Sequence, residues 1–180
     1  EHLELPWDLH ELIKLGTTLM IRQNKEMKKN DDLGNFWKIV QYLISGNQLF
    51  DGGDYKLEIT REFNRKYFEQ GTWKVQKFSF GEPTQLLFLT TSRLFNLYKS
   101  QALREGDKPL PDSTIDYYLR NSAAFICETK KESFKKIDPR TGQQEIDDAG
   151  QKKRTSTTAL VFDYEKLNIT VGSEAEQMEV

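Results

Sequence analysis

Residues 89–136 read LTTSRLFNLYKSQALREGDKPLPDSTIDYYLRNSAAFICETKKESFKK, and this stretch decides which fold we expect. After Thr91 the apolar residues recur at helical spacing, and a threonine hydroxyl can cap the first turn of a helix. Residues 105–111 cannot continue that helix, because they contain two prolines, which lack the backbone N–H that a helix needs. A second, short helix is therefore expected to start with Asp112 or Ser113 as its cap.

The pattern changes from helix to strand after the short helix. Phe125 and Cys127 are expected on one face of a strand, and residues 157–163 alternate in the same way. Between these two strands, residues 137–153 are polar and lack apolar periodicity, which is typical of a solvent-facing loop. The two strands are expected to form a β-hairpin with a long tip. A long helix, a short helix and a hairpin follow one another in this order in a winged helix.

This stretch, closing with RTSTTALVFDYEKL at residues 154–167, resembles the C-terminal winged-helix region of primase–helicase proteins from phages, plasmids and mobile elements. The resemblance covers residues 89–167 and rests on the order of features rather than on one motif. It implies an accessory, DNA-binding role in a larger replication or mobile-element protein. Any ATPase activity would then belong to another domain of that parent protein.

The sequence ahead of this stretch predicts two helices and three strands. Apolar residues at helical spacing favour helices at residues 3–23 and 36–44, joined by a charged connection at residues 25–32. Alternating residues favour strands at residues 55–60, 73–80 and 85–89, with a loop at 61–70 and a turn at 81–84.

The predicted fold class is α+β, with N-terminal helices and a small antiparallel sheet followed by a C-terminal winged helix whose wing is a long β-hairpin. We expect three parts: residues 1–84, residues 85–170, and an acidic, flexible tail at residues 171–180. The strand at residues 85–89 leads directly into the winged-helix segment, so the first two parts are expected to share a sheet.

The composition favours a soluble, cytoplasmic protein without a membrane segment. Charged residues make up 30% of the 180 residues, and no apolar run approaches the roughly 20 residues that span a bilayer. The single cysteine, Cys127, excludes an internal disulfide and is expected to be a buried, inert thiol.

The sequence holds no pattern that predicts catalysis. It lacks a phosphate-binding loop of the Gly-x-x-x-x-Gly-Lys-Ser/Thr type, and its two histidines, His2 and His10, have no cysteine at metal-ligand spacing. We therefore expect no enzyme, no metal and no cofactor in this chain.

The distribution of charge favours nucleic acid, DNA in the first place, as the partner. The net charge is −2, but residues 91–156 carry 13 Lys and Arg against 10 Asp and Glu, a net charge of +3. In a winged helix the second helix can lie in the major groove while the wing contacts phosphates. The candidate contacts on the second helix are Thr114, Tyr117, Arg120 and Asn121. The candidate contacts on the hairpin are Lys130, Lys131, Lys135, Lys136, Arg140, Lys152, Lys153 and Arg154.

The alternative is a protein-interaction or oligomerisation module that does not bind nucleic acid. In that hypothesis the aromatic residues Trp7, Trp37, Trp73 and Tyr117 build a surface for a protein partner or for the parent helicase domain. The salt dependence of binding separates the two hypotheses. Binding to phosphates releases counterions and therefore weakens steeply as the salt concentration rises.

Overall fold

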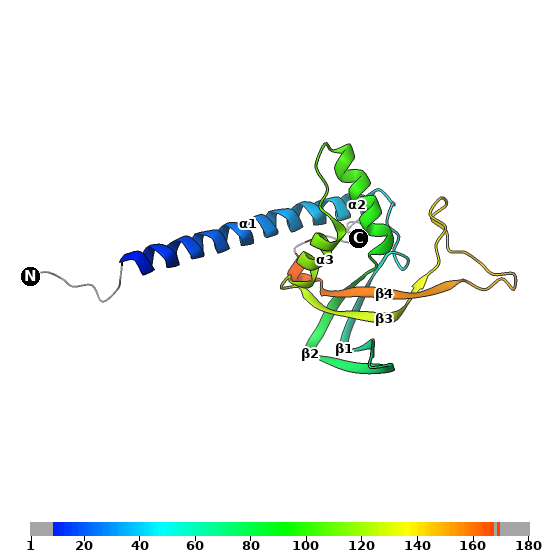
Figure 1. The fold of residues 1–180 in the computed structure, drawn as a ribbon. Coiled ribbons are helices and arrows are strands. Elements are labelled where there is room, and N and C mark those ends of the chain that lie inside the picture. Colours follow the sequence, from blue (N-terminus) through cyan, green and yellow to red (C-terminus); the bar gives the residue numbers. More distant parts are fainter. Residues whose placement is uncertain (1–8, 168, 170–180) are drawn as a thin grey trace, which may run out of the picture. The chain divides into compact units, whose positions relative to one another are not determined.

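A computed structural model describes residues 9–167 and 169 (Figure 1). The chain divides into two units, Glu1–Asn35 and Phe36–Val180. The predicted α+β class is confirmed, and the helices and strands follow one another as α1 (Leu9–Ser45), β1 (Tyr55–Glu69), β2 (Thr72–Leu89), α2 (Ser92–Arg104), α3 (Asp112–Arg120), β3 (Phe125–Lys135), β4 (Arg154–Asp163) and the 3-10 turn η1 (Glu165–Leu167). Within the described residues, no helix combines the length and the apolarity that crossing a membrane would need. The tail predicted at residues 171–180 lies outside the described residues.

The helix α1 is one continuous helix of 37 residues, so the predicted connection at residues 25–32 is wrong. Lys, Glu and Met are good helix formers, and a charged run made of them can form solvated helical turns instead of a loop. Gly16 lies within this helix and does not interrupt it. The first residues of the predicted helix 3–23 lie outside the described part of the chain.

The helices α2 and α3 are where the sequence predicted them, but their caps differ. α2 begins right after Thr91, whose side chain makes no capping hydrogen bond because its backbone is already helical. At the start of α3 the cap position belongs to Pro111, so neither Asp112 nor Ser113 caps it. The carboxylate of Asp112 instead accepts a 2.7 Å bond from Lys99 Nζ of α2. That ion pair joins the two helices.

The four strands form one antiparallel sheet in the order β1-β2-β4-β3. The first part of β2 pairs only with β1, whereas its last residues, 86–89, also pair with residues 160–163 of β4. β2 therefore runs across the predicted boundary between residues 84 and 85 and brings the two segments into one sheet.

The loop predicted at residues 61–70 is wrong, because β1 and β2 form one long hairpin. Its turn is Gln70 and Gly71, which both have positive φ angles, 49° and 77°, as tight hairpin turns require. The turn predicted at residues 81–84 does not end the strand. Thr60 pairs with Thr84 but Glu62 pairs with Ser79, so residues 80–83 bulge out of the ladder. Gly and Pro at a bulge bend a strand without ending it.

The sheet buries side chains on both faces. On the helix side, the Phe36 ring lies 5.2 Å from the rings of Trp37 and Tyr98, and Trp37 packs edge-on against Phe162 of β4. On the other side, a second core consists of Phe63, Leu86, Phe88, Cys127, Phe134, Ala159 and Val161. Val161 and Phe162 are neighbours in β4 and point to opposite faces, as strand alternation requires. Figure 1 shows the far end of the β1–β2 hairpin on the side of β3 and β4 opposite to α2 and α3.

The β3 strand contains two bulges, which change the face of its side chains. One lies between Phe125 and Cys127, so the prediction that these two share a face is wrong. The Phe125 ring lies 5.7 Å from the Phe162 ring on the helix side, whereas Cys127 belongs to the second core. The other bulge lies between Thr129 and Glu132.

Candidate nucleic-acid interface

The short helix α3 presents part of the predicted contact surface. Its apolar residues Ile115 and Leu119 are buried, and Tyr117 on the outer face is 62% exposed. Thr114 is half-buried, and Asn121, just beyond the helix, is exposed with its side-chain amide donating to the Tyr117 carbonyl at 2.8 Å. Tyr117 and Asn121 are therefore the exposed groups of this surface.

The guanidinium of Arg120 is paired with two carboxylates, which compensate its positive charge. Its Nε donates to Asp116 at 2.7 Å, and a terminal nitrogen of its guanidinium donates to Glu128 of β3. Partial burial alone would lower the pKa of Arg120, but these two carboxylates together raise it. Arg120 therefore fixes α3 against β3, which is a structural role.

Four of the eight hairpin cations have carboxylate partners as well. Glu145 is shared by Lys136 Nζ at 2.9 Å and Lys153 Nζ at 4.0 Å. Lys135 lies 3.9 Å from Asp51, and Arg140 lies 3.7 Å from Asp138 while remaining 88% exposed. The longer separations mark exposed, weakly held pairs, which contribute little to stability.

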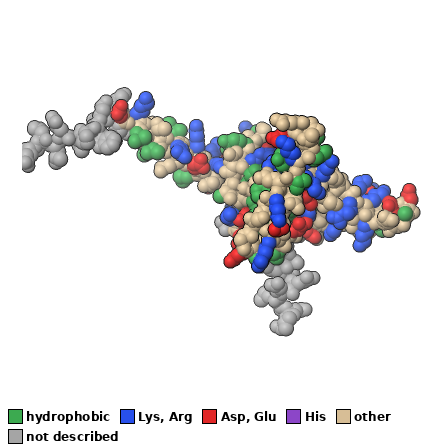
Figure 2. All heavy atoms as spheres, turned by 90° about the horizontal axis from the view of Figure 1, so that it is seen from below, with side chains coloured by type: hydrophobic (Ala, Val, Ile, Leu, Met, Phe, Trp, Pro, Cys, Tyr) green, Lys and Arg blue, Asp and Glu red, His purple; other side chains and the backbone are tan. Residues whose placement is uncertain are grey.

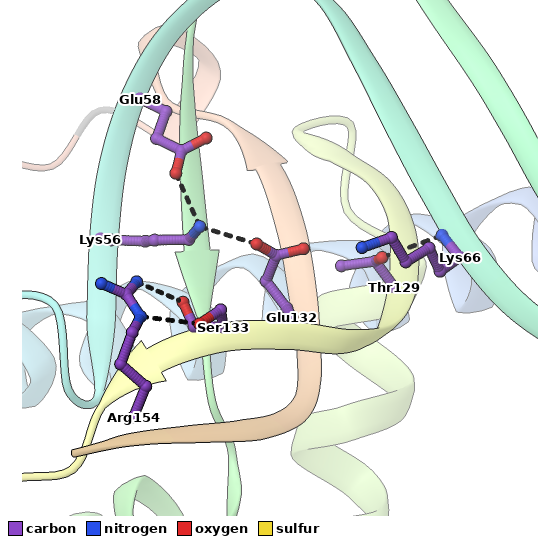
Figure 3. A network of polar contacts seen from close by, with 7 residues as sticks. All are labelled: Lys56, Glu58, Lys66, Thr129, Glu132, Ser133 and Arg154. Atoms are coloured by element: carbon purple, nitrogen blue, oxygen red, sulfur yellow. Dashed lines mark hydrogen bonds and ion pairs between the residues drawn. The ribbon is translucent and has the colours of Figure 1, made fainter.

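Two of the predicted hairpin cations form no carboxylate pair among the described residues, and two have partners of another kind. Lys130 and Lys152 belong to the first group, and Lys152 is exposed. Arg154 donates from Nε to Ser133 Oγ at 2.8 Å and from a terminal nitrogen to the Ser133 carbonyl at 3.3 Å, across the strand pair (Figure 3). Lys131 lies over the ring of Trp73, with Nζ 3.6 Å from the ring centroid.

The tip at residues 137–153 is polar, as predicted, but its backbone is held in place. Bridges join Ile137 to Gln144 and Ile146 to Lys152, and Glu145 N donates to the Lys136 carbonyl at 2.8 Å. The tip projects from the end of β3 and β4 in Figure 1, and Figure 2 shows Lys and Arg side chains along it together with Asp and Glu. The hairpin thus carries its cations away from the core.

Comparison with protein-family models, with curated proteins and with solved structures gave no match.

A cavity of about 350 Å³ at the base of the hairpin is lined by three cations. They are Arg93 of α2, Lys135 at the end of β3 and Lys136 directly after it. Each has a carboxylate partner: Arg93 pairs with Asp54, Lys135 with Asp51, and Lys136 with Glu145. The Arg93 guanidinium also lies 4.8 Å from the centroid of the Phe50 ring. Carboxylates thus partly compensate the positive charge of this cavity.

Lys56 is a partly buried cation that the sequence analysis did not single out. Its Nζ donates to Glu58 at 2.6 Å and to Glu132 at 2.8 Å, and it lies 4.5 Å from the Phe88 ring centroid (Figure 3). Burial would lower the pKa of Lys56, but the two carboxylates outweigh it and the pKa is raised. The ammonium closes one edge of the second core and is not available to a ligand.

The sequence analysis also missed the end of the β1–β2 hairpin, because it predicted a loop there. Arg65 Nε donates to the Glu128 carbonyl at 2.8 Å, and Lys66 N donates to Thr129 Oγ1 at 3.1 Å, so the β1 edge lies along β3. Phe68 and Trp73 are 49% and 47% exposed. The alternation of residues 63–69 was the signal that could have identified this strand.

The aromatic residues of the alternative hypothesis are not in one place. Trp37 is 6% exposed and belongs to the helix-side packing, which excludes it from a partner surface. Trp73 and Tyr117 are exposed, and Trp7 lies outside the described residues.

Proposed function

We propose that this chain binds duplex DNA as an accessory region of a replication or mobile-element protein of the primase–helicase type. α3 would lie in the major groove, and the β3–β4 hairpin would contact the phosphate backbone as a wing. The observation that carries the proposal is topological: α2 and α3 precede a projecting hairpin, and the strands follow the order β2-β4-β3. A short second helix beside a basic hairpin is the arrangement that winged-helix proteins use on DNA.

The charge of the hairpin supports a phosphate contact. Residues 129–154 carry eight Lys and Arg against five Asp and Glu, a net charge of +3. Lys152 is exposed without a carboxylate partner among the described residues, and Arg140 is held only at 3.7 Å. Phosphate contacts dominate affinity and carry no sequence information by themselves.

The surface of α3 supports weak base preference. Specific readout in the major groove most often uses an Arg or Lys that is bidentate to guanine. The arginine of α3, Arg120, is held by Asp116 and Glu128, which leaves Thr114, Tyr117 and Asn121 to face a groove. We therefore expect DNA affinity that varies little with sequence.

A charge-reversal experiment tests the proposal. The double variant Arg140→Glu and Lys152→Glu should weaken duplex binding by roughly tenfold or more at low salt, because two phosphate contacts become repulsive. The measurement is fluorescence anisotropy with a labelled duplex over a salt series, where the slope of log K against log salt should fall by about two.

The matched control is the double variant Lys25→Glu and Lys28→Glu, which makes the same change in net charge on the exposed surface of α1. Its duplex affinity should stay close to that of the unchanged protein. Equal losses in both double variants would show that only net charge matters and would refute the wing contact. Absence of binding at low salt would refute DNA binding and favour the protein-interaction alternative.

A further inference from the structure

The end of the β1–β2 hairpin exposes an aromatic pair that no core uses. Phe68 and Trp73 face each other across the two strands, with ring centroids 5.3 Å apart. About half of each side chain is exposed, and the neighbouring Val75 is 65% exposed on the same face. The aromatic surface is thus open to a flat ligand.

The second bulge of β3 brings a lysine to this pair. Lys131 has a φ of 56°, in the left-handed region that side chains other than Gly, Asn and Asp seldom adopt. This conformation places its Nζ 3.6 Å from the centroid of the Trp73 ring. Strained backbone of this kind persists where the surrounding structure demands it, and it is common at functional sites.

The surroundings of the aromatic pair are strongly basic. Residues 61–77 carry five Lys and Arg against two Asp and Glu, and the bulge adds Lys130 and Lys131. Both acids are already paired, Glu69 with Lys74 and Glu62 with Lys77. The cations without a carboxylate ion pair among the described residues are Arg61, Arg65, Lys66, Lys130 and Lys131, and Arg65 donates instead to the Glu128 carbonyl and to Gln76.

We propose that this hairpin-end patch, formed by Lys66, Phe68, Trp73 and Lys131, binds single-stranded nucleic acid. Bases would stack on Trp73 and Phe68, and the phosphates would lie against Lys131 and Lys66. Basic surfaces with exposed aromatic rings bind unpaired strands in this way, because only unpaired bases expose their faces.

The inference rests on the proposed function and adds a second strand form to it. The duplex contact uses α3 and the wing, whereas this patch uses the other hairpin and the bulge of β3. Together they would hold a junction between duplex and single strand. The residues changed in the wing test, Arg140 and Lys152, lie outside this patch, and Trp73 lies outside the proposed duplex contact.

The test compares two substitutions at Trp73. Trp73→Thr keeps a strand-forming residue but removes the ring, and it should weaken binding of a labelled oligothymidylate by roughly tenfold. Trp73→Phe keeps a ring and should retain most of the affinity. Duplex affinity should change by less than about twofold in both variants, as stacking is not used there.

Lys131→Gly separates binding from folding. Glycine adopts a positive φ without strain, so the thermal midpoint should not fall, while the affinity for oligothymidylate should fall severalfold. Full affinity of Trp73→Thr for oligothymidylate would overturn this inference, while the wing variant would still decide the duplex proposal. If the protein bound neither the duplex nor the oligothymidylate, both proposals would be overturned.

Discussion

At the scale of single residues, the buried polar groups are the most tightly determined part of the molecule. Thr129 is fully buried, and its Oγ1 accepts the backbone N–H of Lys66 at the edge of β1. A buried N–H without a partner is costly, and this hydroxyl supplies the partner where β1 lies along β3 without ladder pairing between the two strands. The same edge is held by the Lys56 ammonium between Glu58 and Glu132.

Cys127 should be inert in the folded protein and should make stability depend on alkaline pH. Burial raises the pKa of the Cys127 thiol to about 11. Since the unfolded thiol has an ordinary, lower pKa, the contribution of the buried neutral thiol is fully present below that value. It is lost as the pH rises toward about 11.

The measurement is urea unfolding from neutral to alkaline pH for the unchanged protein and for Cys127→Ala. The difference in unfolding free energy between them should shrink as the pH rises, and iodoacetamide should not label the folded protein at neutral pH. Rapid labelling at neutral pH would contradict the burial of this thiol.

Individual contact residues could be predicted from the sequence only in part. Asp116 and Arg120 are four residues apart, and this spacing indicates an ion pair on one helix. The second partner, Glu128, comes from β3 and cannot be read from local spacing. Likewise, nothing local to Lys131 predicts that a bulge carries it to Trp73. The sequence shows the type of each residue, but it does not show which distant residue it contacts in the fold.

At the scale of elements, α1 should show two levels of backbone protection. Residues 13–28 have exposed side chains throughout, including Ile13, Met20 and Met27, whereas Phe36, Ile39 and Val40 are buried. Isolated helical turns are marginal in water, since most helical stability comes from packing of one face.

Hydrogen exchange followed by mass spectrometry measures this difference. Amides of residues 13–28 should exchange rapidly, and those of residues 38–45 should exchange slowly through opening of the whole unit. Slow exchange throughout residues 13–28 would show that another surface covers that part of the helix.

The sequence identified the helices α2 and α3 and the strands β3 and β4, because their periodicity is regular and prolines separate the helices. In the β1–β2 hairpin, the sequence wrongly predicted a loop at residues 61–70 and a strand end at residues 81–84. Residues 61–70 are rich in charge, and Gly81 and Pro83 carry turn chemistry, so local preference indicated loops. Pairing with a partner strand and packing on the second core overrode that preference.

At the scale of the whole molecule, two cores share the sheet and should unfold together. Phe134 and Phe36 are both fully buried, one in the second core and one on the helix side. Truncating either to alanine should cost about 3–5 kcal/mol, by lost burial and a residual cavity. Because β2 and β4 contribute to both faces, each variant should still show a single transition.

Urea denaturation followed by circular dichroism and by tryptophan fluorescence checks this expectation. The two probes should give the same midpoint in both alanine variants. A second transition confined to Phe134→Ala would mean that the β1–β2 hairpin end unfolds separately from the helices.

The α+β class and the order α2, α3, β3 and β4 followed from periodicity, which is a local property of the chain. The second core did not, because it requires the β1–β2 hairpin to bend over β3 and β4. That bend depends on bulges, whose positions are set by cross-strand pairing rather than by local pattern.

The bulge at residues 129–132 also makes the chain sensitive to insertion and deletion. Cys127 and Phe134 both enter the second core although they are seven residues apart, which regular alternation forbids. The extra residue of the bulge shifts the alternation by one position, so that both side chains point to the same face. Removing one residue there would send the Phe134 ring to the opposite face, a larger perturbation than most single replacements in the bulge could cause. Proteins related to this one should therefore differ in residue type within this segment but keep the same number of residues there.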